Sequence, residues 1–167
     1  MKVIFSHGKE SGPWGFKIKR LSMLAQMERC QVESVDYTSE LDPDERVKML
    51  LEVIAKEEGD FILVGSSMGG YVSLVASELV DARALFLIAP ALAMPGFAKQ
   101  QYHSRCAHIE VVHGWSDDII PVENSIAFAQ QADCGLHIIS GDHPLNDSIV
   151  TIEQLFTQFL NTVFNPQ

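Results

Sequence analysis

The sequence has few cysteines, no long apolar run and a shortage of basic residues. Its three cysteines are far apart (Cys30, Cys106 and Cys134), which leaves neither a disulfide framework nor a Cys-x-x-Cys metal site. No run of about 18 apolar residues is present to cross a membrane, and the opening apolar segment 3–5 is too short for a signal peptide. We therefore expect a cytoplasmic protein without membrane insertion.

The charge balance narrows the classes of partner. The chain has 12 Lys and Arg against 22 Asp and Glu, which gives a net charge of −10. A nucleic-acid binder needs a basic face that neutralises phosphates, and this balance argues against one. With 167 residues, 47% of them apolar, the chain is long enough for a single domain over 1–167 with a sizeable core. We expect a small molecule as the partner, while the oligomeric state stays open.

Short β-branched and aromatic runs alternate with helical patterns along the chain. Several runs, such as 61–64 and 85–88, are continuously apolar, which is typical of strands buried on both faces of a parallel sheet. The alternation predicts an α/β fold, an open parallel sheet with helices on both faces. The predicted strands are Lys2–Ser6, Gln31–Asp36, Asp60–Gly65, Ala84–Ala89, His108–His113 and Leu136–Ser140.

Capping residues mark the ends of the predicted helices. Asp42 and Pro43 supply an N-cap and a first helical residue, and Gly59 marks the other end of that helix. Pro121 opens a shorter helix through Ala129, and an apolar stripe over 149–163 predicts the last helix. Weaker patterns predict two more helices, over Phe16–Gln26 and Met68–Val80.

One long irregular stretch covers residues 90–107. It contains Pro90, Pro95 and Gly96, which leave room for no more than a short helix. Long loops in compact domains are often binding loops or lids, so we expect a short lid-like loop here.

The sharpest chemical signal is the pattern G-x-S-x-G centred on Ser67. It follows a predicted strand and precedes a predicted helix, which is the context of a nucleophile elbow. The turn is sharp, so the residues two before and two after the serine must lack bulk, and Gly65 and Gly69 meet that need. A plain glycine-rich turn is the alternative, whereas a Walker-type phosphate loop would need a lysine that is absent. Ser67 is therefore the predicted nucleophile.

An acidic pair supplies candidates for the third member of a Ser-His-Asp triad. Asp117 and Asp118 follow the strand that ends at His113, downstream of the serine, where the triad acid is expected. That acid holds the catalytic histidine in the right tautomer and stabilises its charged form. Either carboxylate could instead cap the helix that follows.

The predicted general base is His143, in the loop between the last strand and the last helix. A loop at this edge of the sheet can bring an imidazole to the serine. His7 and His113 each precede a glycine at a strand end, and we expect them to hold loop geometry by hydrogen bonds. No group of His, Asp and Glu has the spacing of metal ligands, so we expect no metal and no other cofactor.

The glycine-rich loop 6–15 after the first strand is the predicted oxyanion loop. In an elbow of this kind, one backbone N–H comes from this loop and one from the residue after the nucleophile. We assign these donors to the backbone amides of Lys9 and Met68. A simple turn or a phosphate cradle is the alternative, although the glycine spacing does not fit G-x-G-x-x-G.

Four motifs, taken in order, make the chain resemble the α/β-hydrolase superfamily. They are His7-Gly8, Gly65-x-Ser67-x-Gly69, His113-Gly114-x-x-Asp117-x-x-Ile120-Pro121, and His143 before the last helix. The third motif favours Asp117 over Asp118 as the acid, and the likeness covers almost the whole chain.

Within that superfamily the chain is similar to small, lidless bacterial members. The resemblance implies a three-layer α/β/α sandwich with a six-stranded, all-parallel sheet of order 2-1-3-4-5-6. It also implies that the first two strands of the usual eight are missing, as is a large cap after Ala89. The site is then expected at the carboxyl edge of the strands.

The motifs and the resemblance together imply a serine hydrolase. Ser67, His143 and Asp117 would cleave carboxylic esters or thioesters of small acyl substrates through an acyl-enzyme. Two alternatives are a peptidase or amidase with the same triad, and a binding module of the same fold with little turnover.

The substrate pocket is predicted from aromatic and methionine side chains on loops. Trp14, Met94 and Phe97 are the tentative lining residues, and Phe16 and Tyr102 are further candidates. The alternative is that most of them belong to the core. Little chain remains for a long tunnel, so we expect an open site for a short acyl group.

Overall fold

Six strands and five helices are present in residues 1–165, the part of the chain that the computed structural model describes. None of these helices is both long and apolar enough to cross a membrane. The strands are β1 (Lys2–Ser6), β2 (Gln31–Val35), β3 (Phe61–Ser66), β4 (Ala84–Ile88), β5 (His108–Gly114) and β6 (Gly135–Ile139). The helices are α1 (Phe16–Met27), α2 (Pro43–Ile54), α3 (Met68–Ala76), α4 (Val122–Ala132) and α5 (Ile149–Phe164).

All six strands are parallel and lie in the order β2-β1-β3-β4-β5-β6, as predicted. Lys2 at the start of β1 pairs with Gln31 of β2 and with Phe61 of β3, so these three strands begin level. Because parallel strands end at the same edge, the loops after β1, β3, β5 and β6 meet there. The sheet therefore gathers the four predicted motifs at one edge.

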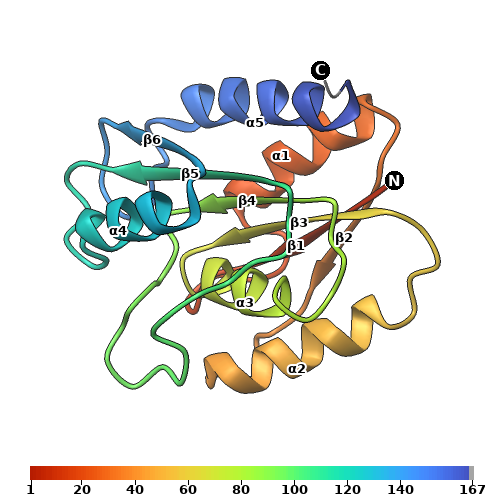
Figure 1. Cartoon of the computed structure of the whole chain (residues 1–167). Coiled ribbons are helices and arrows are strands. Elements are labelled where there is room, and N and C mark those ends of the chain that lie inside the picture. Colours follow the sequence, from red (N-terminus) through yellow and green to blue (C-terminus); the bar gives the residue numbers. More distant parts are fainter. Residues whose placement is uncertain (166–167) are drawn as a thin grey trace.

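Helices cover both faces of the sheet, which confirms the three-layer α/β/α arrangement (Figure 1). Side chains alternate along each strand, so Val3 and Phe5 of β1 face α1 and α5, whereas Ile4 faces α2 and α3. Phe128 of α4 packs on the same side as α2 and α3. Each face of the sheet thus has its own apolar core.

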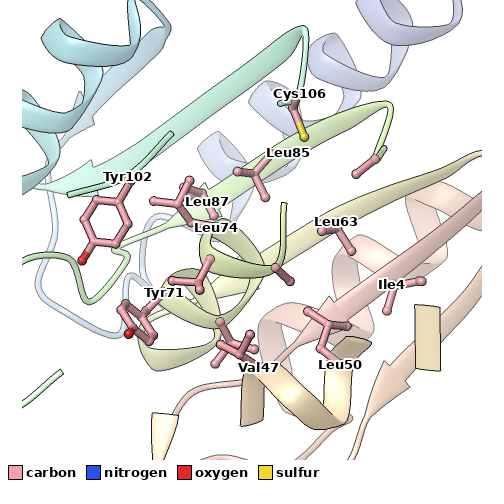
Figure 2. Close-up of a cluster of buried hydrophobic side chains, with 14 of the residues drawn as sticks. Ile4, Val47, Leu50, Leu63, Tyr71, Leu74, Leu85, Leu87, Tyr102 and Cys106 are labelled. Carbon is pink, nitrogen blue, oxygen red and sulfur yellow. The ribbon is translucent and has the colours of Figure 1, made fainter. Parts of the chain in front are cut away.

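Helix α3 lies in the middle of one of these cores. Figure 2 shows Tyr71 and Leu74 of α3 beside Val47 and Leu50 of α2 and the sheet residue Leu63. Every residue of α3 is buried, which explains why its sequence is apolar or small all round. The helix that begins at the predicted nucleophile is therefore held on all sides.

Two helices end earlier than predicted. Helix α2 stops at Ile54 and not near Gly59, because the hydrogen bonds tighten there to a three-residue spacing, as in Glu57 N–H to Ile54 O. Helix α3 stops at Ala76 and not at Val80 for the same reason. At the other end of α2 the predicted cap is confirmed, since the Asp42 carboxylate accepts from two backbone amides of the first turn.

Residues 90–107 form neither a helix nor a strand, so the short helix allowed for in this loop is absent. Two tyrosines of the core instead hold the segment. The Tyr71 hydroxyl accepts from the Lys99 amide (3.1 Å), and the Tyr102 hydroxyl accepts from the Ala93 amide (3.0 Å). Ala93 itself has a positive φ of 51°, which is uncommon for a residue with a Cβ atom.

Candidate active site

Ser67 lies in the sharp turn between β3 and α3. Its backbone is strained, with φ of 55° and ψ of −122°. A Cβ atom added at Gly65 would overlap the Gly69 carbonyl, and one added at Gly69 would overlap the Ser6 carbonyl. The two glycines are therefore required by close approach of the backbone, as the G-x-S-x-G pattern predicts.

A continuous chain of hydrogen bonds links three predicted residues at the carboxyl edge of the sheet. The Ser67 hydroxyl lies 2.9 Å from His143 Nε2, and His143 Nδ1 lies 2.8 Å from Asp117 Oδ2. An ionised carboxylate can only accept, so Nδ1 carries the proton and Nε2 is free to accept from the serine. This tautomer is the one that a general base needs.

The Asp117 carboxylate is enclosed, with 0% of its side chain exposed. Its Oδ1 atom accepts from the backbone amides of Ile119 (2.9 Å) and Ile120 (2.8 Å). Burial alone would raise the pKa of Asp117, but hydrogen bonds from the Ile120 amide and the His143 ring outweigh it and hold the pKa below its ordinary value. Asp118 is exposed and lies outside this chain of hydrogen bonds.

His113 also forms a hydrogen bond with the Asp117 carboxylate. Its Nε2 lies 3.0 Å from Asp117 Oδ2 and 3.1 Å from the Ile120 carbonyl, so Nε2 is the protonated nitrogen. Its Nδ1 then accepts from the Ser125 hydroxyl (2.7 Å). Burial lowers the pKa of His113 and keeps its ring neutral. His113 thus holds the acid loop by hydrogen bonds, as expected.

The loop that carries His143 is anchored on both sides. Lys17 of α1 donates to the Pro144 carbonyl (2.6 Å), and the Leu145 amide donates to Asp142 Oδ1 (3.0 Å). Leu145 is fully buried with a positive φ of 55°, so its side chain fixes the turn after the histidine. Burial also lowers the pKa of Lys17. The loop that carries the imidazole is therefore held by α1 and by a hydrogen bond of its own.

A cavity of about 800 Å³ opens at Ser67 and His143. Gly8 lies beside the serine, since a Cβ added there would be 3.4 Å from the Ser67 Cβ atom. Lys9 and Met68, the predicted amide donors, both line the cavity. The apolar part of its wall includes Phe16, Ile18, Ala91, Met94, Phe97, Ile119 and Ile120.

The predicted pocket residues therefore separate into three groups. Met94, Phe97 and Phe16 line the cavity. Trp14 is not among the lining residues, although 43% of its surface is exposed. Tyr102 is buried and packs in the core between Tyr71 and Phe128.

Sequence reasoning missed Arg46, a fully buried cation behind the loop 6–15. Its guanidinium donates to backbone carbonyls of that loop and of the segment that follows β2. A signal for its burial is present, because Arg46 precedes Leu50 and Ile54 by four and eight residues. Those two residues belong to the buried face of α2, so the helical spacing places Arg46 on that face too.

The fold and the geometry of the elbow place the chain among the hydrolases of the α/β superfamily. A protein of Xanthomonas campestris pv. campestris assigned to that superfamily is 31% identical, over 96% of this chain and 98% of the other, with a TM-score of 0.89. Est1E from Butyrivibrio proteoclasticus shares the fold: it is 18% identical over 97% of this chain and 87% of the other, with a TM-score of 0.81. The ydeN gene product of B. subtilis also shares it: it is 18% identical over 96% of this chain and 98% of the other, with a TM-score of 0.80.

At the level of the family, the chain belongs to UPF0227, described as an uncharacterised protein family, whose sequence pattern matches residues 2–101. No curated protein matches the chain. The matched region contains β1, the turn at Ser67 and the loop 6–15, while Asp117 and His143 lie beyond it.

Proposed function

We propose that the protein is a serine hydrolase that cleaves carboxylic esters or thioesters of small acyl substrates. The observation that carries the proposal is the hydrogen-bonded series Ser67–His143–Asp117, with its serine in an elbow at the mouth of a cavity. A nucleophile, a base and an orienting acid within hydrogen-bond reach make up the minimal set for acyl transfer.

In the first half of the reaction, His143 Nε2 takes the hydroxyl proton as the Ser67 oxygen attacks the acyl carbonyl carbon. The tetrahedral intermediate collapses when the imidazolium returns that proton to the leaving alcohol or thiol, which leaves an acyl-enzyme. In the second half, His143 Nε2 takes a proton from water as the water oxygen attacks the acyl carbon, and the imidazolium then returns that proton to the Ser67 oxygen as the carboxylic acid is released. Asp117 orients the imidazole and stabilises its charge in both halves.

The oxyanion formed in both halves is stabilised by the backbone amides of Lys9 and Met68. The Met68 amide is at the first residue of α3, where the unpaired N–H groups and the helix dipole favour negative charge. The apolar wall, with Met94 and Phe97, takes the hydrocarbon part of the substrate. We expect short acyl groups to react fastest.

The test is covalent labelling with a fluorophosphonate, followed by mass spectrometry of the labelled peptide. We expect one label, on Ser67, and none on a Ser67→Ala variant. Neighbouring Ser66 is the internal control, because it is the last residue of β3 and has no hydrogen bond to His143. Folded protein that stays unlabelled at Ser67 would sink the proposal.

Hydrolysis of p-nitrophenyl esters of graded chain length then tests the substrate class. We expect kcat/KM to be highest for the two- to four-carbon acyl groups and to vanish in Ser67→Ala. Faster cleavage of matched p-nitroanilides than of the esters would assign the same residues to amide hydrolysis instead.

A further inference from the structure

Arg46 is a buried cation with an unusual set of partners. It lies on α2 with 0% of its surface exposed, and none of the ion pairs among residues 1–165 includes it. Its Nε donates to the Glu40 carbonyl (2.6 Å) and its Nη2 to the Tyr37 carbonyl (3.2 Å). A buried guanidinium that has no carboxylate among its hydrogen-bond partners is costly to retain.

The remaining nitrogen of Arg46 holds the oxyanion loop. Nη1 donates to the carbonyls of His7 (3.4 Å) and Gly8 (3.3 Å). His7 adds a second donor to the Gly8 carbonyl, because its Nδ1 lies 2.7 Å from that oxygen while its Nε2 accepts from the Tyr37 amide (2.9 Å). Burial lowers the pKa of His7, so one neutral tautomer serves both bonds. The Gly8 carbonyl therefore accepts from Arg46 and His7, with the Ser11 hydroxyl as a third, more distant donor (3.5 Å).

The direction of that carbonyl sets the direction of the next amide. Residues 1–165 contain no cis peptide bond, and in a trans peptide the carbonyl of one residue and the N–H of the next point opposite ways. With the Gly8 oxygen turned toward Arg46 and His7, the Lys9 N–H points away from them. Gly8 lies beside Ser67 and both Gly8 and Lys9 line the cavity, so the opposite side is the side of the nucleophile.

The same loop is also fixed against the elbow. Gly69 packs so closely on the backbone that a Cβ there would lie 2.7 Å from the His7 carbonyl oxygen. That carbonyl is a second acceptor of Arg46 Nη1. The Lys9 and Met68 amides are thus carried by two backbone segments in direct contact, one of which Arg46 clamps from behind.

We propose that Arg46 is a positioning residue for oxyanion stabilisation, which aims the Lys9 N–H by fixing the Gly8 carbonyl and adds a buried positive charge behind it. The inference rests on the proposed function. Donors fixed before the reaction stabilise an oxyanion without reorganising, and a buried charge acts there through a low dielectric. Arg46 acts through the backbone and does not touch the substrate.

The test compares Arg46→Lys and Arg46→Met with Leu50→Ala, a control one turn along the same buried face of α2. For p-nitrophenyl acetate we expect kcat to fall about 10-fold in Arg46→Lys, which keeps the charge but not the fork, and about 100-fold in Arg46→Met. KM should stay within about 3-fold, since the loss falls on the transition state. Leu50→Ala, assayed below its unfolding temperature, should keep kcat within about 2-fold.

A double-mutant cycle tests whether Arg46 acts through the Lys9 amide. Lys9→Pro removes the amide donor, so adding Arg46→Lys to it should lower kcat by less than about 2-fold more. Full additivity would overturn the route, as would a folded Arg46→Lys with the kcat of the parent. If Arg46→Met does not fold, Arg46→Lys and the cycle still decide.

Labelling rates separate the two proposals. Parent protein that reacts with a fluorophosphonate at Ser67 but no faster than Arg46→Lys would overturn only the role of Arg46. Parent protein that neither reacts at Ser67 nor hydrolyses any ester would overturn the proposed function and this inference with it. We expect rapid labelling of the parent and slow labelling of both Arg46 variants.

Discussion

Asp117 and Asp118 have the same side chain and adjacent places in the sequence, yet their surroundings give them different chemistry. The Asp117 carboxylate has 0% exposure and accepts from two backbone amides and two imidazoles. Such a carboxylate stays ionised and fixed in direction. Asp118 is exposed, so water solvates its charge and leaves its position loose.

This contrast predicts that replacing aspartate by asparagine has a large effect on kcat at position 117 and almost none at position 118. Asp117→Asn places an amide N–H against His143 Nδ1, which favours the tautomer with its proton on Nε2, where it cannot accept from Ser67. We expect kcat to fall by about 10³- to 10⁴-fold with little change in fold. Asp118→Asn should stay within about 2-fold. Steady-state kinetics on one ester, with circular dichroism as a check on folding, makes the comparison; equal effects at the two positions would contradict the assignment of the acid.

At this scale the sequence is informative where function depends on a local pattern. The place of Ser67 in a sharp turn could be predicted because that turn needs glycines at fixed spacing, and the place of His143 at the same edge could be predicted because its loop follows the last strand. Arg46 could not be predicted in the same way, because its partners are backbone carbonyls of the loop after β1 and the segment after β2. Any residue type can supply a backbone carbonyl, so no sequence motif indicates these acceptors.

At the scale of secondary-structure elements, β1, β3 and α3 meet in a junction of closely packed backbone. A side chain on Gly69 would overlap the carbonyl oxygen of Ser6 and come within 2.7 Å of that of His7, and neither can move without displacing β1. Close packing of this kind tolerates no added methyl group. The turn at Ser67 and the loop 6–15 are therefore coupled by contact between backbones.

We accordingly expect Gly69→Ala to lower the free energy of unfolding by about 3 kcal/mol and to abolish activity. Gly59→Ala is the matched control, because a Cβ there has nothing within 4 Å and the backbone φ is not positive. That control should change stability by less than about 0.5 kcal/mol. Urea denaturation of both variants measures the difference. Similar stabilities would mean that β1 and α3 can separate at little cost.

Element positions could be predicted well, and element ends less well. All six strands were predicted within one residue at each end, because apolar β-branched runs buried on both faces leave a continuous signal. Helices α2 and α3 end where the backbone hydrogen bonds change from a four-residue to a three-residue spacing. No glycine marks that change in the sequence. Residues 90–107 are shaped by bonds to Tyr71 and Tyr102, partners outside any local pattern.

For the whole molecule, acidification has two effects of opposite sign. The net charge is −10 at neutral pH, and the excess negative groups repel one another more strongly in the compact state than in the unfolded state. Protonation of the six histidines would reduce the net charge and with it this repulsion. Against this, burial lowers the pKa of His7 and His113 in the folded state. At about 0.15 M salt, charges more than about 8 Å apart are screened, whereas a buried group is not. We expect the buried histidines to dominate.

The sign follows from proton binding. A histidine whose folded pKa lies below its unfolded value of about 6.5 binds more protons when unfolded, so stability is lost as pH falls below about 6.5. Each such histidine contributes up to about 1.4 kcal/mol per pH unit. His7 is the stricter case, because its Nε2 accepts from the fixed Tyr37 amide and a proton there would face another donor, whereas the Ser125 hydroxyl beside His113 can rotate.

Urea unfolding between pH 7.5 and pH 5.5 in 0.15 M salt measures this balance. In the parent we expect the free energy of unfolding to fall as the pH falls. The His7→Gln variant should be less stable at pH 7.5, and its free energy of unfolding should depend less steeply on pH, by up to one proton. Leu50→Ala, which lowers stability without removing a titratable group, is the control and should keep the parent slope. A parent that gains stability over this range would mean that charge repulsion outweighs the buried rings.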